Sequence, residues 1–316
     1  MSMVLGLDTS CYTTSLALAQ DGRLIAQQRR LLKVEKGERG LQQSAGVFQH
    51  MKNLPDLMEA LFKETGPVEI EAVCASARPR PNEDSYMPVF LAGVGLARSV
   101  AALKGVPLRL TSHQQGHVRA AMVDAGLPEG EPFLAVHLSG GTTELLRVDG
   151  LNIDLLGGSK DLHAGQFVDR AGVKMGLGFP AGPELERLAM QGSAQSVLPS
   201  WVRGMDCSFS GAETQIQRLI ERGEHSREDL AAEVFSCIAR TLAKMLGQAV
   251  RQTGLKHILL SGGVASSTYL REIFPGRMAR ERVGAKLHWG RPELSGDNAA
   301  GVALIGSEWQ NWYPND

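Results

Sequence analysis

The alternation of apolar and polar positions predicts two similar β-hairpins that begin 130 residues apart in the chain. The first hairpin, at 4–22, reads VLGLDTSCYTTSLALAQDG, and the second, at 134–150, reads LAVHLSGGTTELLRVDG. In each, an apolar strand leads to a turn of small hydroxyl residues, a second apolar strand and an Asp-Gly turn. The matching positions are Ser10 and Ser139, Thr13 and Thr142, Thr14 and Thr143, and Asp21–Gly22 and Asp149–Gly150. The repeat predicts a duplicated α/β domain that holds a nucleotide in the cleft between its halves.

Turns at the ends of strands offer backbone N–H groups to an anion. The first turn of each hairpin combines such groups with hydroxyls, which suits phosphate. The segment Ser261–Ala265, SGGVA, follows an apolar strand and opens a helix, whose N-terminus favours negative charge. The loop Gly176–Gly182, GLGFPAG, is also permissive for the backbone. The alternative for each is a tight turn that only packs. No GxxxxGK[ST] pattern occurs, so P-loop chemistry is not expected.

The rest of the chain alternates between helical and strand patterns, which predicts a three-layer α/β domain in each half. The expected helices lie near 47–64, 89–104, 113 onward, 167–174, 183–191, 213–222, 227–254 and 297 onward. The expected further strands lie near 70–76, 107–111, 153–156, 256–261 and 286–289. We therefore predict an N-terminal lobe at 1–125 and a C-terminal lobe at 126–316.

Composition narrows the function classes. The chain has 316 residues, 43% hydrophobic and 21% charged, with a net charge of −1. Bulk charge therefore does not drive nucleic-acid binding, and a solvated helix face is the favoured interpretation of the basic run Arg277–Arg282. The first strand begins at Val4, which leaves no room for a signal peptide, and no apolar run reaches membrane-spanning length. We expect a cytoplasmic protein. The cysteines, which show no paired spacing, are Cys11, Cys74, Cys207 and Cys237.

The most specific chemical pattern is His113-Gln-Gln-Gly-His117. The preceding Thr111–Ser112 can cap a helix, which places both imidazoles on one helix face at i and i+4. That spacing suits one Fe, Zn, Cu or Ni ion, with a third ligand from elsewhere. Gln114 stands where a zinc protease has its glutamate base, so proteolysis is not expected. The alternative is a pair of surface histidines. Near the last helix, the default role of Asp297 is an N-cap.

These motifs, taken in order, resemble the TsaD family, whose members were formerly described as O-sialoglycoprotein endopeptidases (peptidase M22-like). The matching segments are DTSC (8–11), HQQGH (113–117), LSGGTTELLRV (138–148), AGQFVDRAG (164–172), GLGFPAGP (176–183), SFSG (208–211), SGGVAS (261–266) and GDNAA (296–300). The resemblance implies the duplicated actin/Hsp70/hexokinase-like (ASKHA) fold, with a nucleotide cleft between two lobes. It also implies transfer of threonylcarbamoyl from an adenylate to N6 of the adenosine beside the anticodon of tRNA.

The resemblance implies roles for particular residues. The implied ligands of one divalent transition metal, iron or zinc, are His113, His117 and Asp297. Asp8 and Ser10 are predicted as catalytic residues. An adenine nucleotide or threonylcarbamoyl-AMP is expected to contact Ser139, Gly140, Gly141, Thr142, Asp169, Gly182, Glu186, Gly262, Gly263 and Ser267. The metal would polarise the carbamoyl carbon toward the adenosine amine.

The chain also departs from the family pattern, which indicates a divergent paralogue. The substituted positions are Tyr12 and Thr13 for two acids, Gln115 and Gln166 for glutamates, Thr142 for histidine, Glu213 for lysine and Ser267 for asparagine. A longer loop at 78–88 replaces a glycine-rich one. Two interpretations follow. The chain is a metal- and nucleotide-binding transferase, which transfers threonylcarbamoyl to tRNA or a related carbamoyl-type group to another acceptor. Alternatively, it is a non-catalytic or regulatory paralogue that acts as a partner of a true synthase. A TsaB-like or TsaD-like partner in a homo- or heterodimer, and tRNA, are the expected partners, with no membrane.

Overall fold

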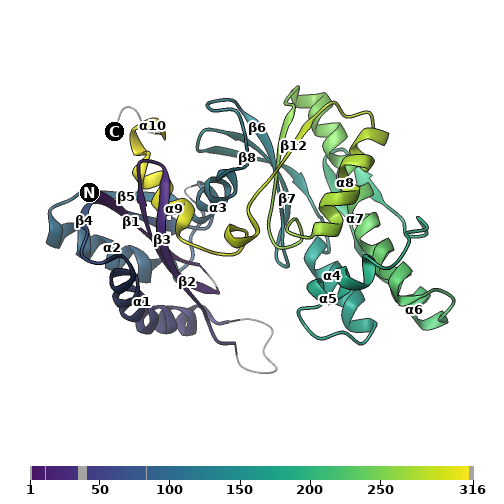
Figure 1. Cartoon of the computed structure of the whole chain (residues 1–316), viewed down its shortest axis with the longest axis horizontal. Helices are drawn as coiled ribbons and strands as arrows, with labels where there is room; N and C mark the ends of the chain where they lie inside the picture. Colours follow the sequence, from purple (N-terminus) through teal and green to yellow (C-terminus); the bar gives the residue numbers. More distant parts are fainter. Residues whose placement is uncertain (1, 11, 35–40, 83, 313–316) are drawn as a thin grey trace. The chain divides into compact units, whose positions relative to one another are not determined.

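The protein divides into two compact units, each of which contains its own sheet and core (Figure 1). The computed structural model describes residues 2–10, 12–34, 41–82 and 84–312. The first unit comprises Met1–Val123 together with Glu293–Asp316, and the second comprises Asp124–Pro292. Within the described ranges, none of the helices has the length and apolarity needed to cross a bilayer.

The first unit is a five-stranded mixed sheet with helices on both faces. Its strands, in the order β3-β2-β1-β4-β5, are β1 (Ser2–Thr9), β2 (Thr13–Gln20), β3 (Arg23–Leu31), β4 (Glu69–Arg78) and β5 (Leu108–Ser112). Its helices are α1 (Gln43–Thr65), α2 (Phe90–Lys104), α3 (His113–Met122), α9 (Ala300–Ser307) and α10 (Trp309–Trp312). Apolar side chains of α1 and α2 pack on one face of the sheet, and those of α9 pack on the other. The predicted loop at 78–88 joins β4 to α2, and its Glu83 lies outside the described residues.

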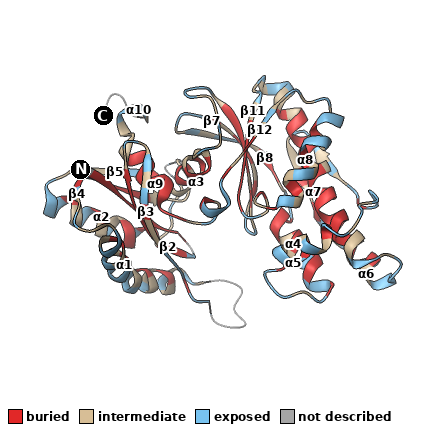
Figure 2. Ribbon diagram, in the orientation of Figure 1, coloured by how far each residue is buried: buried red, intermediate tan, exposed pale blue. Residues whose placement is uncertain are grey.

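The second unit has the same sheet with different helices. Its strands, in the order β12-β11-β6-β7-β8, are β6 (Phe133–Leu138), β7 (Thr143–Asp149), β8 (Asn152–Gly158), β11 (His257–Ser261) and β12 (Lys286–Trp289). Its helices are α4 (Ala164–Lys174), α5 (Gly182–Ala189), α6 (Ser210–Arg222), α7 (Arg227–Thr253) and α8 (Thr268–Arg280). Figure 2 shows α7 as the most deeply buried helix of this unit. We did not predict the hairpin of β9 (Trp201–Arg203) and β10 (Asp206–Ser208) in this unit, nor the short 3-10 helix η1 (Pro292–Leu294), at which the chain passes from the second unit to the first.

The strand order and directions confirm the predicted duplication. In each unit the first strand pairs antiparallel with the second and parallel with the fourth, and the fourth pairs parallel with the fifth. The hairpin registers also match, because Thr9 lies opposite Thr14 and Leu138 lies opposite Thr143. The turns that follow Thr9 and Leu138 therefore occupy equivalent positions in the two hairpins.

The C-terminal segment differs from the sequence prediction, which placed all of 126–316 in the second lobe. Residues 293–316 instead belong to the first unit. The reason is close packing of α9 on β1: a Cβ atom at Gly6 would lie 2.5 Å from the backbone nitrogen of Ala303. Gly301 likewise allows contact with α3, where an added Cβ would lie 1.8 Å from the carbonyl oxygen of Gly116. The return of the chain to the first sheet brings residues near 297 beside α3.

The three described cysteines are free thiols in the interior, as their spacing indicated. Burial raises the pKa of Cys74 and of Cys207 to about 12 and that of Cys237 to about 11. Cys11 lies outside the described residues.

Candidate metal centre and nucleotide cavity

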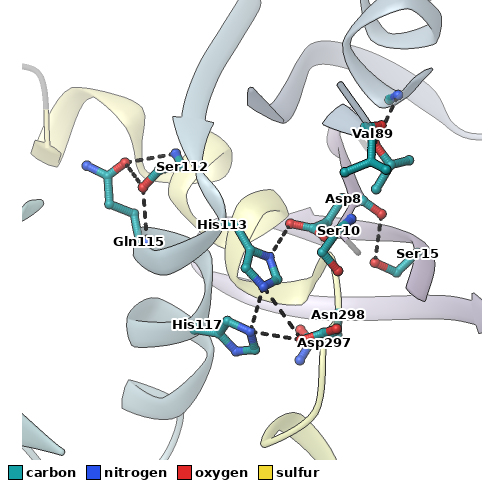
Figure 3. Close-up of polar contacts among 12 residues, drawn as sticks. Asp8, Ser10, Ser15, Val89, Ser112, His113, Gln115, His117, Asp297 and Asn298 are labelled. Carbon is teal, nitrogen blue, oxygen red and sulfur yellow. Dashed lines mark hydrogen bonds and ion pairs between the residues drawn. The ribbon is translucent and has the colours of Figure 1, made fainter. Parts of the chain in front are cut away.

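Two histidines and an aspartate converge in the first unit. Helix α3 begins at His113, and the Ser112 side chain caps it by accepting a hydrogen bond from the backbone of Gln115. This start places both imidazoles on one face, as the i, i+4 spacing predicted. The two Nε2 atoms lie 2.9 Å apart. Asp297 Oδ1 lies 3.1 Å from Nε2 of His117 and 3.5 Å from Nε2 of His113 (Figure 3).

The spacing of these three atoms fits a transition metal. Adjacent ligand atoms on an octahedral or tetrahedral ion with bonds of about 2.1 Å lie about 3.0–3.4 Å from each other, which is close to the separations observed among these three atoms. Two imidazoles and one carboxylate form a donor set typical of iron or zinc. Among the described residues, this is the one group of three or more His, Cys, Asp or Glu side chains whose ligand atoms converge in this way.

Asp8 holds His113 in the orientation that such a site needs. Its Oδ2 accepts a hydrogen bond of 2.8 Å from His113 Nδ1, and its Oδ1 accepts one of 3.0 Å from the backbone N–H of Ser10. With Nδ1 donating to Asp8, Nε2 is the ring nitrogen that faces Asp297 and His117, and it can bind a metal once its own proton is displaced. Asp8 is 1% exposed, and both of its oxygens are engaged. These contacts favour a positioning role for the carboxylate that we predicted as catalytic.

Ser10, the other predicted catalytic residue, sits beside Asp8 (Figure 3). Its side chain is buried, and its hydroxyl has no hydrogen-bond partner within the described part of the chain. A buried hydroxyl without a partner is unusual and indicates that another group completes its hydrogen bonding.

The charges in this cluster are strongly coupled. Burial disfavours the charged form of each group, but the neighbouring charges outweigh burial. As a result, His113 holds the pKa of Asp8 below its usual value, and Asp8 and Asp297 hold the pKa of His113 well above 6.5. His113 and His117 hold the pKa of Asp297 well below 3.8. The carboxylates are therefore ionised at neutral pH, and metal binding displaces a proton from His113.

Asp297 is not used at the start of α9, because the neighbouring Asn298 binds the first N–H of that helix. We predicted a helix cap as the default role of Asp297 from its position, and a metal ligand from the family resemblance; its carboxylate lies beside the two histidines and does not cap α9. Helix α9 begins at Ala300 and not at 297, and Asn298 Oδ1 accepts a hydrogen bond of 2.9 Å from the backbone N–H of Ala300. This leaves the Asp297 carboxylate to face the histidines.

Two of the substituted family positions turn out to be helix caps. Gln115 Oε1 accepts hydrogen bonds from the Ser112 backbone and hydroxyl, 2.9 and 2.8 Å long. Gln166 Oε1 accepts one of 3.2 Å from the backbone N–H of His163, just before α4. Both side chains therefore occupy the third position of a helix and fold back on its start. We had read both as charge lost from the cleft, but a glutamine keeps the oxygen that these caps use.

The second unit contains a cavity of about 370 Å³ that collects many of the predicted nucleotide contacts. Six of those residues line it: Gly140, Asp169, Gly182, Glu186, Gly263 and Ser267. The other four predicted contacts, Ser139, Gly141, Thr142 and Gly262, lie in the adjoining turns but do not line it. Its size is typical of a small-molecule site.

The cavity is built from turns and helix N-termini. Gly262 has a φ of +95°, and a Cβ there would lie 2.3 Å from the carbonyl oxygen of Leu138, so only glycine fits this turn. Asp169 accepts a hydrogen bond of 2.8 Å from the backbone of Ala181, and Glu186 accepts one of 3.0 Å from the backbone of Tyr269. Ser267 caps α8. These contacts fix loops that present N–H groups where α5 and α8 begin, an arrangement suited to an anion.

Sequence reasoning missed several residues of both sites. Phe235, from α7, lines the cavity. In the sequence it lies among other apolar residues, so nothing distinguishes it from a core residue. His50 is fully buried against the first turn. The sequence contained a sign of this, because His50 is a polar residue at a core position of α1. The remaining substituted positions lie at Tyr12 and Thr13 in the first turn, at Thr142 in the second and at Glu213 on α6.

Similarity to known proteins identifies the family to which the chain belongs. The family model described as TsaD, tRNA N6-adenosine threonylcarbamoyltransferase, matches residues 42–304. The tRNA N6-adenosine threonylcarbamoyltransferase of Thermus thermophilus is 35% identical over 311 residues, which cover 95% of this chain and 91% of the relative.

Solved structures with this fold share little sequence. HypF of T. kodakarensis has a TM-score of 0.62 and 14% identity, over 98% of this chain and 48% of its own, so the chain spans about half of that protein. The activator of the 2-hydroxyisocaproyl-CoA dehydratase from Clostridium difficile has a TM-score of 0.55 and 18% identity, over 98% and 96% of the two chains. The ROK family glucokinase of Streptomyces griseus has a TM-score of 0.54 and 11% identity, over 96% and 98%. These structures show the ASKHA fold, and the sequence matches show that the chain belongs to the TsaD family of transferases.

Proposed function

We propose that this protein transfers a threonylcarbamoyl group from threonylcarbamoyl-AMP to N6 of adenosine in tRNA. The observation that carries the proposal is the convergence of His113 Nε2, His117 Nε2 and Asp297 Oδ1, with His113 oriented by Asp8. A protein that only supports a partner has no use for such a donor set. In the reaction, N6 forms a bond to the carbamoyl carbon and loses a proton, while the bond from that carbon to the phosphate oxygen breaks and AMP leaves.

The two units have different roles in the proposed reaction. His113, His117 and Asp297 would hold an iron or zinc ion, which would supply Lewis-acid polarisation of the carbamoyl group. In the first unit, Asp8 keeps the proton on Nδ1 of His113, so that Nε2 remains a ligand. In the second unit, the turns at Gly140 and Gly263 and the helix starts at Gly182 and Ser267 bind the adenylate and hold its phosphate. The cavity thereby orients the group to be transferred, and its affinity contributes to the rate by proximity.

The alternative, a non-catalytic paralogue, loses part of its support. Gln115 and Gln166 were two of the lost acids that favoured it, and both are capping residues whose hydrogen bonds survive the change. The substitutions at Tyr12, Thr13, Thr142 and Glu213 still separate this chain from the family pattern. None of the four is one of the metal ligands. We therefore expect them to affect the affinity for the adenylate and the choice of protein partner.

Metal analysis and a transfer assay on the purified protein test the proposal. We expect about one equivalent of iron or zinc per chain, binding of AMP and of a non-hydrolysable adenylate analogue, and transfer of labelled threonylcarbamoyl to unmodified tRNA. The assay is run alone and with a TsaB-like protein, since a protein partner is also part of the proposal. Metal and nucleotide binding without transfer under either condition would favour the non-catalytic paralogue. Absence of both kinds of binding would reject the transferase.

A further inference from the structure

His50 is the polar exception in the buried stripe of α1. The residues of α1 that face the sheet are Gly46, His50, Leu54, Leu57 and Leu61. The imidazole has no exposed surface, and both of its nitrogens are engaged. Nε2 lies 2.9 Å from the carbonyl oxygen of Ser10, and Nδ1 lies 2.8 Å from the hydroxyl of Thr14. The ring therefore joins both ends of the first hairpin turn to α1.

The chemistry of the partners fixes the proton positions. A carbonyl oxygen can only accept, so Nε2 of His50 carries the proton and donates to Ser10. The neutral ring then accepts at Nδ1 from the Thr14 hydroxyl. That hydroxyl oxygen in turn accepts a hydrogen bond of 3.1 Å from Nδ2 of Asn53, one turn along α1. Every donor in this series has one acceptor, and burial lowers the pKa of His50, which favours the neutral ring.

The hydrogen bonds continue from the turn to the metal ligands. The same Ser10 whose carbonyl oxygen accepts from His50 donates its N–H to Asp8 Oδ1, at 3.0 Å. The other oxygen of Asp8 accepts from His113 Nδ1, at 2.8 Å. The orientation of His113 thus depends on Asp8, and that of Asp8 depends on the backbone of Ser10.

We propose that His50 is a positioning residue for the metal centre, acting on His113 through the Ser10 backbone and Asp8. The inference rests on the proposed function in so far as His113 is a metal ligand. His50 itself lies outside the ligand set and does not touch the reacting atoms. Its N–H to Ser10 holds the turn in the one conformation in which the Ser10 N–H and the Asp8 carboxylate meet. Loss of that donor frees the turn, and His113 loses its fixed orientation.

Two substitutions at His50 separate the two hydrogen bonds of the ring. In His50→Gln, the side-chain amide nitrogen reaches the place of Nε2 and still donates to Ser10. In His50→Asn, the shorter amide reaches only the place of Nδ1, near Thr14, and the donor to Ser10 is lost. Both variants remove the ring, so a merely structural role predicts similar losses of thermal stability and no difference between them at the metal centre.

The first readout is the Nδ1 proton of His113 in the metal-free protein, observed by NMR with ¹⁵N-labelled histidine and assigned with His113→Gln. A proton held by a buried carboxylate resonates far downfield. We expect the signal to persist in His50→Gln and to shift or broaden in His50→Asn. The second readout is Co²⁺ affinity, followed by its absorption. We expect binding within about twofold of the unaltered protein for His50→Gln and about tenfold weaker for His50→Asn, as for other supporting partners of metal-ligating histidines.

Equal behaviour of the two variants, whether both keep or both lose the His113 signal and Co²⁺ affinity, would overturn the proposal. If neither folds, Thr14→Val and Thr14→Ser provide a second pair. Serine keeps the hydroxyl that fixes the His50 tautomer and valine removes it, and the same readouts apply. The NMR signal needs neither metal nor substrate. A protein that shows the expected difference but no transfer would reject the proposed function and leave the role of His50 intact.

Discussion

The two hairpin turns share one backbone plan but use it in different ways. Each turn joins two antiparallel strands, and the strand pairs have equivalent registers. In the first turn, Ser10 and Thr13 are buried. In the second turn, Gly140 and Gly141 are exposed, and Gly140 lines the cavity. The first turn therefore serves as a support for Asp8 and His113, while the second remains open to a ligand. We had expected both turns to offer their hydroxyls to phosphate, and only the second is accessible for it.

The difference arises from the helix that contacts each turn. Thr14 and Thr143 occupy equivalent positions, directly after their turns. The hydroxyl of Thr14 binds the His50 ring on α1. The hydroxyl of Thr143 instead accepts a hydrogen bond of 2.8 Å from the backbone N–H of Ala164, the first residue of α4. A Cβ at Gly165 would lie 2.6 Å from the nitrogen of Gly140, so α4 approaches the turn closely without covering it. The two units thus share the same arrangement of strands, and the helices that follow these strands give the two turns different roles.

If the two turns serve separate sites, removal of the metal ligands should leave the nucleotide cavity intact. In the double variant His113→Ala, His117→Ala, two of three ligands are gone, so we expect metal content to fall from about one equivalent to background. Transfer should fall by at least about 100-fold. AMP affinity, measured by calorimetry, should change by less than about twofold, since all cavity residues lie in the second unit. Full retention of metal by the double variant would remove the ligand assignment.

The converse change fills the cavity. A Cβ at Gly263 meets no atom within 4 Å, so Gly263→Trp can fold normally and place its indole in the ligand space. We expect AMP affinity to fall by about 100-fold, or about 2.8 kcal/mol, with metal content unchanged. Gly284→Trp is the matched control, because Gly284 also has open space around it and does not line the cavity. Equal AMP affinity in the two variants would place the nucleotide elsewhere.

A smaller effect is expected when the support and not the ligand is changed. Asp8→Asn keeps the size of the side chain but removes the charge that holds the Nδ1 proton of His113. An amide that donates to Nδ1 would stabilise the wrong tautomer, so we expect metal affinity to fall by about 10–100-fold. Competition with a chelator measures the change. An affinity within twofold of the unaltered protein would show that Asp8 does not orient the ligand, and would reopen a direct catalytic role.

Sequence patterns were sufficient for much of the fold and for the histidine pair on α3. Alternating apolar residues located the sheet strands, and the hydroxyl-rich turns identified the duplication, because strand pairing depends on local pattern. The pair His113 and His117 was visible because helix periodicity fixes which side chains share a face. Asp297 could be assigned only through family resemblance, since 180 residues separate it from His117.

Other features depended on tertiary contacts that no local pattern contains. The return of 293–316 to the first unit is decided by the fit of Ala303 against Gly6. Likewise, Gln115 looked like a lost acid until its hydrogen bonds with Ser112 showed a cap. The role of His50 follows from contacts with residues 36 and 40 positions away. In each case the sequence shows the residue type, but it does not show which residue that side chain contacts.

The equivalent threonines allow a matched test of stability. Thr14→Val leaves Nδ1 of His50 without its donor, and Thr143→Val leaves the Ala164 N–H without its acceptor. Valine has the same shape, so each change should cost about 1–2 kcal/mol of unfolding free energy, measured by urea denaturation. We expect Thr14→Val to weaken Co²⁺ binding and Thr143→Val to weaken AMP binding. The same pattern of ligand effects in both variants would argue against separate tasks for the two turns.

The least pronounced effect is a pH dependence confined to the first turn. Burial lowers the pKa of His50 below 6.5, although the Ser10 carbonyl and the Asp8 charge act in the opposite direction. As pH falls through 6.5 the unfolded chain takes up this proton and the folded protein does not, so stability decreases. One proton limits the slope to about 1.4 kcal/mol per pH unit, and the loss stops below the folded pKa. The side chain of His50→Gln cannot titrate. Between pH 7 and pH 5, the unfolding free energy of this variant should therefore fall less than that of the unaltered metal-free protein. Parallel curves would mean that His50 takes up its proton as readily in the folded protein as in the unfolded chain, and the lowered pKa of the neutral ring between Thr14 and Ser10 would have to be abandoned.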